Sequence, residues 1–462
     1  MIKQRLSLLA FLGSLLVFSG GGCTNARVVD AEKLIADEIN SIPTGWQFAS
    51  RNTDFANEWS TLFDDAYLQD YMRRAIQQNL DLKQFEARLR ESQANLRQAR
   101  SLLGPSVAAN LGASGVASVS DVADTDQSFG STVSFLWDLD VFGVNKDTAR
   151  RAMAQTDVEK ARLSRRVREL QAQVALTYFQ IVEADQQLLI AQENLSFIAE
   201  TNRVSEARFQ AGDISRSDLA LSELEFENAR ANVEIQNFAT RSARRSLSVL
   251  IGGFGDDSLK VSRALPANPE SGVTEYPADV LSNRHDVSAA RAAVQIELEN
   301  LKAVAKGNLP SFTISGRLAG STSSLLDLFD PDVYLSSLAL NIDALLYDSG
   351  RLAARTEAAS SRVDAAVFAY AQTLREAVLE VNNSFDEAAA LKEAFLILER
   401  ARTSAEEALS LEQIRFELGE AILLDVLTVQ RRVNAIKSSR INVERRMLDA
   451  QVAAFLALGD NA

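Results

Sequence analysis

The chain has 462 residues, of which 47% are hydrophobic, and a formal net charge of −14. This length and apolar content indicate a folded chain with room for two or three ordinary domains, while the acidic surplus argues against a nucleic-acid partner, because binding phosphates requires a surplus of Lys and Arg. With one histidine, His285, and one cysteine, Cys23, the sequence lacks a His/Cys metal site and a Cys/His nucleophile pair. We therefore expect no enzyme and no cofactor, although carboxylate-only chemistry stays open.

The N-terminal segment 1–22 is predicted to be a secretory signal, because a basic start precedes a largely apolar stretch at 6–18. Cys23 follows three glycines and resembles the lipidated cysteine of bacterial lipoproteins, although Gly20 stands where such signals usually carry Leu. Acyl chains on Cys23 would anchor the N-terminus in a bilayer, and ordinary cleavage near Ala26 is the alternative. Since no later stretch has the roughly 20 continuous apolar residues of a membrane-spanning helix, any crossing must use strands.

An internal repeat divides the rest of the chain into two halves. RFQAGDISRSDL at 208–219 matches RFELGEAILLDV at 415–426, an offset of 207 residues, and Pro105 matches Pro310 at an offset of 205. Each half is predicted to run helix, strand, strand, long helix, turn, helix. The expected layout is a signal at 1–22, an extended N-terminal segment with a lipid anchor at 23–65, a first repeat at 66–250, a linker at 251–277, a second repeat at 278–458 and a tail at 459–462.

The predicted helices include two that are much longer than a compact domain requires. In the first of them Val167, Val174 and Ile181 recur every seven residues, with Leu170 and Thr177 between them, which is the spacing of a coiled-coil seam. About 66 helical residues make a rod of roughly 100 Å, so we expect an elongated fold. The predicted helices are 66–103, 145–210 and 215–250 in the first half, and 278–307, 349–417 and 421–458 in the second.

The predicted strands alternate between apolar and polar residues. Val107 and Leu111 face one way and Ser106 and Asn110 the other, as on a strand with a lipid face and a wet face. A soluble sheet with one buried face alternates in the same way, but each run reaches the roughly 9–11 residues that a tilted membrane strand needs. The predicted strands are 106–119, 128–141, 311–323 and 333–343, of which the last alternates poorly.

The number of strands indicates that the chain needs partners. Four strands cannot close a membrane barrel, and an open edge in hydrocarbon leaves backbone N–H and C=O groups unpaired. Two copies would give eight strands and an interior filled by side chains, whereas three copies give twelve strands and a wider lumen. A trimer is therefore the smallest assembly that we expect to conduct.

Several segments together resemble one family: FLWDLDVFG at 135–143, RHDVSAARAAV at 284–294, NLPSFTISG at 308–316 and the two RF-x-x-G-x5-D segments. They are similar to the TolC-like outer membrane factors of Gram-negative bacteria, especially the lipoprotein, NodT-type branch. The resemblance implies a mostly α-helical homotrimer in the outer membrane, whose twelve-stranded β-barrel, four strands per chain, continues into a long periplasmic α-helical barrel.

The function implied by the resemblance is that of a passive exit duct in a tripartite efflux or secretion system. Such a duct carries out no chemistry and docks a periplasmic adaptor (membrane fusion) protein and an inner-membrane transporter. The alternative is a non-conducting periplasmic coiled-coil scaffold or adaptor protein, which would also be exported, acidic and rich in helix.

The resemblance also implies that the two helix–turn–helix tips form a closed periplasmic entrance, whose gate aspartates match Asp218 and Asp425. The alternative role of both aspartates is to cap the returning helices. Ala421 stands where an arginine can occur in the family, and Thr428 stands where a second aspartate can occur. The family's gating contacts therefore cannot be assigned to this chain residue by residue. Gly212 and Gly419 are predicted to end the long helices in the left-handed backbone conformation. Arg208 and Arg415, near the C-terminal ends of those helices, are predicted to interact favourably with the helix dipole. The predicted helix-tip turns comprise Gly212, Gly419, Arg208, Phe209, Arg415 and Phe416.

Overall fold

The computed structural model describes residues 33–46, 63–118, 121–268 and 277–459, with the side chains of 116–126 left out. The chain divides into two compact units. The sheet unit is built mainly from residues 87–161 and 288–372, and the helical unit from residues 42–86, 162–287 and 373–462. Each unit takes segments from both sequence halves, so the two repeats are not separate bodies.

The predicted helices are confirmed, except that two of them are each divided into two shorter helices. Residues 66–103 form two helices because Asn79 adopts an extended backbone; its side chain accepts a bond from the Leu82 N–H (3.1 Å) and donates one to the Leu250 carbonyl (2.9 Å). Residues 278–307 likewise form two helices, with a break at 283–284. The helices are α3 Ala66–Gln78, α4 Leu80–Ser101, α5 Val144–Ala211, α6 Arg216–Leu250, α7 Pro277–Ser282, α8 His285–Ala305, α9 Arg351–Glu417 and α10 Leu423–Leu458.

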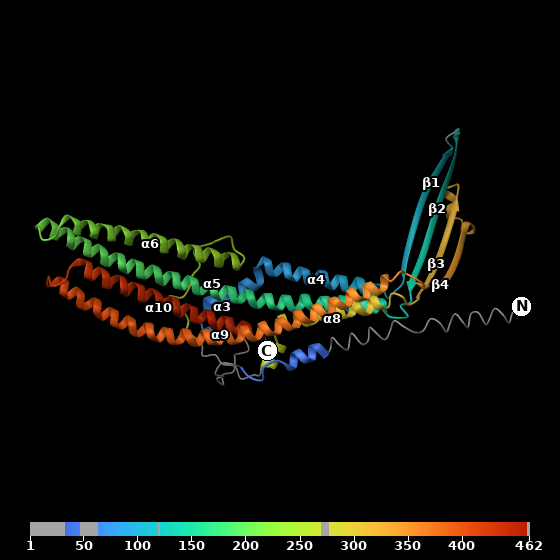
Figure 1. Ribbon diagram of the computed structural model, residues 1–462. Helices are drawn as coiled ribbons and strands as arrows, with labels where there is room; N and C mark the ends of the chain where they lie inside the picture. Colours follow the sequence, from blue (N-terminus) through green and yellow to red (C-terminus); the bar gives the residue numbers. More distant parts are fainter. Residues whose placement is uncertain (1–32, 47–62, 119–120, 269–276, 460–462) are drawn as a thin grey trace. The chain divides into compact units, whose positions relative to one another are not determined.

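The sheet unit holds one antiparallel sheet with the strand order β1-β2-β3-β4 (Figure 1). All four predicted strands are confirmed. The first hairpin is longer than expected, since β2 begins at Asp121 and its pairing with β1 continues past the point where hydrophobic alternation stops. Backbone pairing does not require alternation, and no proline or glycine interrupts 116–129. The strands are β1 Ser106–Ser118, β2 Asp121–Asp138, β3 Ser311–Thr322 and β4 Tyr334–Asp343.

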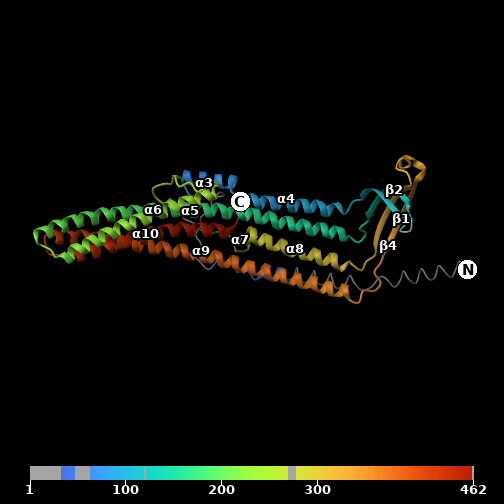
Figure 2. The ribbon, with the colours of Figure 1, turned by 90° about the horizontal axis from the view of Figure 1, so that it is seen from above.

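In the helical unit, α6 returns along α5 and α10 returns along α9 (Figures 1 and 2). Leu170, Val174 and Ile181 of the predicted seam are fully buried, and the other predicted seam residues of α5 are buried or half-buried. Heptad spacing keeps one stripe of a helix against its neighbours, which explains how a helix of 68 residues packs along its length. The coiled-coil prediction for α5 is therefore confirmed.

The main core of the helical unit contains a group of aromatic residues among aliphatic ones. Phe63 contacts Phe179 edge to face, with ring centroids 5.1 Å apart, and both rings are fully buried. The buried hydroxyl of Tyr178 donates to the Asp65 carboxylate (2.7 Å), and the Tyr71 hydroxyl donates to the Lys260 carbonyl (2.8 Å). Each hydroxyl thus has a partner, which removes the main cost of burying tyrosine.

Candidate functional sites in the sheet and at the helix tips

The strand register places most of the large apolar side chains of the four strands on one face. Cross-strand partners point to the same face of a sheet, and Val133 is the partner of both Ala109 and Leu318. Ile314 is the partner of Trp137 and Leu340 in the same way. The apolar face comprises Val107, Ala109, Leu111, Ala113, Phe129, Val133, Phe135, Trp137, Phe312, Ile314, Leu318, Tyr334, Leu338, Leu340 and Ile342, with Gln127, Ser131, Thr322 and Ser336 as its described polar members.

The opposite face is small and polar. Leu136 and Leu335 are its large apolar members, and most of its other residues carry hydroxyl, amide or charged groups. The sheet therefore has two chemically distinct surfaces. The described polar residues of this face are Ser106, Asn110, Ser114, Ser128, Thr132, Ser134, Asp138, Ser311, Thr313, Ser315, Arg317, Ser321, Ser337, Asn341 and Asp343.

The fourth strand shows what register adds to sequence pattern. Its alternation is poor because Leu335 interrupts the polar face and Ser336 the apolar face. Pairing with β3 nevertheless assigns Leu338, Leu340 and Ile342 to the apolar face. The strand therefore extends both surfaces rather than ending them.

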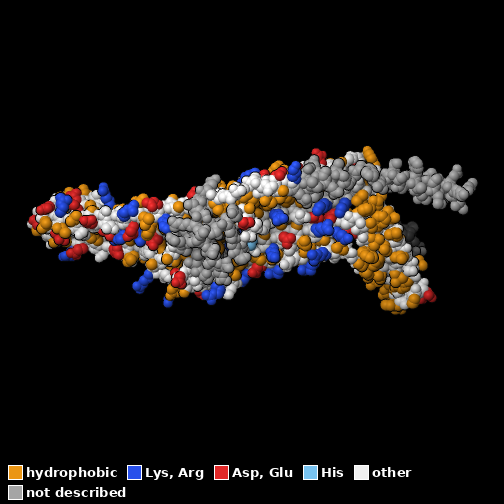
Figure 3. Space-filling model, turned by 90° about the horizontal axis from the view of Figure 1, so that it is seen from below, with side chains coloured by type: hydrophobic (Ala, Val, Ile, Leu, Met, Phe, Trp, Pro, Cys, Tyr) orange, Lys and Arg blue, Asp and Glu red, His pale blue; other side chains and the backbone are white. Residues whose placement is uncertain are grey.

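No described segment of the chain covers the apolar face. Leu111 on β1 is 80% exposed and Leu338 on β4 is 79% exposed. Figure 3 shows hydrophobic side chains gathered over the sheet. A contiguous apolar surface of this kind marks contact with lipid or with another protein.

The sheet is also open at its sides. β1 and β4 are its outer strands, and within the described chain each is paired along one edge only. Unpaired edges are sites where further strands add. An apolar face combined with two open edges is the arrangement expected of one section of a larger sheet in lipid.

Both long helices end at the predicted glycines in the same way. At the end of α5 the Gly212 N–H donates to the Phe209 carbonyl (3.0 Å), and the Asp213 N–H donates to the Arg208 carbonyl (2.9 Å). With φ at +84° Gly212 adopts a conformation that side chains disfavour. This is a Schellman turn, and the end of α9 repeats it: Gly419 has φ at +76°, its N–H donates to the Phe416 carbonyl (3.1 Å), and the Glu420 N–H donates to the Arg415 carbonyl (2.8 Å).

Asp218 and Asp425 make the capping contacts of the returning helices. The Asp218 carboxylate accepts bonds from the Ser215 hydroxyl (2.7 Å) and the Ser215 N–H (3.0 Å), and these bonds lower the pKa of Asp218. The Asp425 carboxylate accepts from the Ile422 N–H (3.2 Å), where the equivalent residue offers no hydroxyl. The capping role is therefore present, and a role in a gate stays a prediction.

One contact joins the two tips and was not predicted. The Arg208 guanidinium lies 4.5 Å from the centroid of the Phe416 ring, so the arginine of the first RF pair stacks on the phenylalanine of the second. Arg415 instead pairs with Glu412 of its own helix (2.9 Å). Equivalent positions in the repeat thus have different partners: Arg208 contacts the opposite hairpin, whereas Arg415 contacts its own helix.

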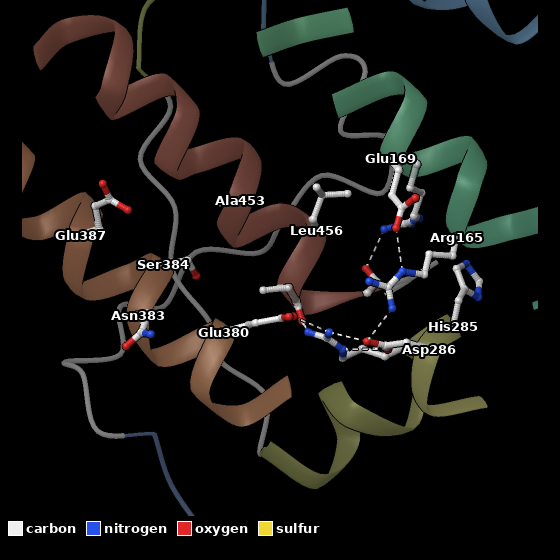
Figure 4. A pocket seen from close by; sticks show the side chains of 14 residues that line it. Arg165, Glu169, His285, Asp286, Glu380, Asn383, Ser384, Glu387, Ala453 and Leu456 are labelled. Carbon is white, nitrogen blue, oxygen red and sulfur yellow. Dashed lines mark hydrogen bonds and ion pairs between the residues drawn. The ribbon is translucent and has the colours of Figure 1, made fainter. Parts of the chain in front are cut away.

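A second unpredicted feature of the helical unit is a cluster around Arg284, defined as Arg165, Arg284, Asp286 and Glu380. The Arg284 side chain, 5% exposed, donates to both carboxylate oxygens of Asp286 (3.0 and 2.6 Å) and to Glu380 (2.6 Å). It also donates to the Ala457 carbonyl (2.6 Å), and Arg165 adds an ion pair to Asp286 (3.0 Å). The Arg284 cluster lines a cavity of about 410 Å³, toward which Arg165, Asp286 and Glu380 are directed in Figure 4.

Residues 71–253 and 276–460 match the family model of the outer membrane efflux protein. The chain belongs to this family. The predicted resemblance to outer membrane factors is thereby confirmed, and the location of this outer membrane efflux protein is the outer membrane of a Gram-negative bacterium. Its mostly helical fold with one four-stranded sheet per chain is the fold of these channels, as predicted.

Similar proteins match this outer membrane efflux protein over nearly their whole length. The pyoverdine export outer membrane protein OpmQ of Pseudomonas aeruginosa is 24% identical over 90% of each chain, and nodulation protein T of Rhizobium leguminosarum bv. trifolii is 23% identical over 87% of each chain. A crystal structure of CusC covers 91% of this chain and 98% of its own, with a TM-score of 0.79 at 20% identity.

The described helices of this outer membrane efflux protein include none that is long and apolar enough to cross a membrane. Cys23, the predicted lipidation site, lies outside the described residues. Lipidation therefore stays a prediction. Labelled palmitate should enter the wild-type protein but not Cys23→Ser, and equal labelling of both would contradict it.

Proposed function

We propose that three copies of the chain close their sheets into one twelve-stranded barrel that conducts solutes across the outer membrane. The observation that carries this proposal is the continuous apolar face on four strands whose outer edges are open. Lipid can cover the apolar face, while a neighbouring copy can pair with each open edge. Three copies of a four-stranded sheet give twelve strands, enough to leave a lumen lined by the polar face.

The conduit acts as the exit duct of a tripartite system. It docks a periplasmic adaptor and an inner-membrane transporter, and the transporter supplies the energy and selects the cargo. Membership of the outer membrane efflux protein family supports this role, and so does the name of one relative, an export protein for pyoverdine. The relatives are efflux channels rather than enzymes, which supports a passive duct.

The experiment for this proposal is to isolate the outer-membrane fraction and reconstitute the protein in planar bilayers. A duct gives trimers that resist heating in detergent and discrete steps of conductance. The competing scaffold gives trimers without conductance or no membrane association at all. Monomeric protein in the soluble fraction after removal of the signal would contradict the duct.

The proposed periplasmic gate rests on Asp218 and Asp425, which threefold symmetry would gather into a ring of six carboxylates. Like charges around a narrow lumen attract cations, so replacing both aspartates with alanine should reduce cation selectivity and raise single-channel conductance, by roughly two-fold or more. The check is conductance and reversal potential in planar bilayers.

The matched control for the gate is Asp213→Ala with Glu420→Ala. These acidic residues occupy equivalent positions in the two tip turns, and both are exposed. Only their backbone N–H groups take part in the Schellman turns. If the control raises conductance as much as the double aspartate variant, the gate is not specific to Asp218 and Asp425. If neither variant changes conductance or selectivity, only their capping role remains.

A further inference from the structure

Arg317 occupies an isolated position on the polar face of the sheet. It lies in the middle of β3, exposed, and its register partners are Ser134 on β2 and Ser337 on β4. Ser134 in turn is the partner of Ala108 on β1. A single large cationic side chain therefore stands in a row of small residues that runs across all four strands.

The acidic residues of the described polar face are distant from this row. Asp138 is four positions from Ser134 along β2, and Asp343 is six positions from Ser337 along β4, which corresponds to roughly 13 and 20 Å at the rise of a strand. Both aspartates lie where the strands lead into the long helices. The middle of the polar face thus carries positive charge and its helical end negative charge.

Resting on the proposed trimeric channel, we propose that Arg317 is a selectivity-determining residue, one of three guanidinium groups that form an anion-attracting ring in the membrane part of the lumen. Threefold symmetry places the three groups at one height, and the small neighbours leave them in water and open to passing solutes. Guanidinium keeps its charge at every physiological pH and binds carboxylate and phosphate oxygens in pairs. The favoured solutes are therefore anions that carry carboxylate or phosphate groups.

Water in the lumen limits how strongly the three Arg317 charges can change ion permeability. Unit charges 4 Å apart in water interact by about 1 kcal/mol, and salt at 0.1 M screens them within about 10 Å. The ring should therefore bias permeation only a few-fold, and more at low salt. We expect Arg317→Ser to lower the ratio of chloride to potassium permeability by roughly two- to five-fold, Arg317→Glu to lower it further, and Arg317→Lys to retain it.

The test measures reversal potentials under a potassium chloride gradient, for each variant alone and together with Asp218→Ala and Asp425→Ala. The combined variants show the effect of position 317 on ion selectivity without the effect of the carboxylates at the helix tips. Arg446→Ser removes an exposed arginine of α10 and serves as the control for net charge. Unchanged permeability ratios for Arg317→Glu in both backgrounds would overturn the proposal. A wild-type protein that forms no channel would instead contradict the proposed function.

A second measurement separates selectivity from folding. Arg317→Cys is assembled first and then treated with a cationic or an anionic thiol reagent, with the wild-type channel, whose one cysteine is Cys23, as the control. The cationic reagent should restore the wild-type permeability ratio and the anionic reagent should shift it toward potassium. Equal ratios after both reagents would show that position 317 does not face the conducting path.

Discussion

Replacing Arg284 with alanine is expected to lower the thermal unfolding midpoint by roughly 6–10 °C. The substitution leaves Asp286, whose side chain is 16% exposed, with only Arg165 as its ion-pair partner, and leaves the Ala457 carbonyl without its bond. Breaking a buried ion pair by removing one partner costs about 3 kcal/mol or more. In a domain of this size, each kcal/mol of lost unfolding free energy lowers the unfolding midpoint by about 2–4 °C.

The matched control is Arg446→Ala. Arg446 pairs with Glu387 (2.9 Å), but the two side chains are 48% and 50% exposed, and exposed pairs contribute about 1 kcal/mol at most. Circular dichroism gives the midpoints, and hydrogen exchange of residues 447–458 should speed up in Arg284→Ala alone. Equal midpoints for the two variants would show that the Arg284 cluster does not stabilise the unit.

The pH dependence of stability tests the same cluster. Burial by itself would raise the pKa of Asp286, but hydrogen bonding and attraction from Arg284, with attraction from Arg165, lower it below the usual value. A lowered pKa means that the stabilisation is complete above the pKa of the unfolded chain and is lost as pH falls through the folded pKa. The drop in unfolding midpoint on acidification below about pH 4 should therefore be smaller in Arg284→Ala than in the wild type.

Local pattern was enough to predict most elements of this fold. Heptad spacing in α5 and the glycines at 212 and 419 each depend on residues close together in sequence, so helix length and helix ends could be read directly. The division at Asn79 was missed because it depends on a bond to Leu250, 171 residues away. The faces of β4 were ambiguous for the same reason, since pairing with β3 decides which way Leu335 and Ser336 point.

The contacts that the sequence did not reveal join segments far apart in the chain. Arg208 and Phe416 were both named as tip residues, but nothing in either RF pair shows that one stacks on the other. Arg284 lies within the segment RHDV, which indicated a family resemblance but no contact of Arg284. The one available signal was Gly459, beyond the end of α10: its φ is +74°, and a Cβ there would lie 2.9 Å from the Arg284 side chain. A glycine at a helix end can thus mark a close approach as well as a turn.

Leu338→Arg should abolish assembly in the outer membrane, whereas Ala339→Arg, one residue further, should be tolerated. Leu338 lies on the apolar face opposite Gly316, and Ala339 lies on the polar face opposite Ser315. An arginine that faces lipid near the middle of a bilayer costs about 2–4 kcal/mol, and a trimer would bear this cost three times. At position 339 the same side chain would point into the water of the lumen, at almost the same depth.

The measurement is the yield of heat-resistant trimers in the outer-membrane fraction for both variants. Because neighbouring residues of a strand point to opposite faces, the pair changes the direction of one charge and very little else. A lipid-facing barrel predicts trimers for Ala339→Arg and few for Leu338→Arg. If both variants assemble equally well, the apolar face does not meet lipid; if Ala339→Arg alone fails, the two faces have been assigned the wrong way round.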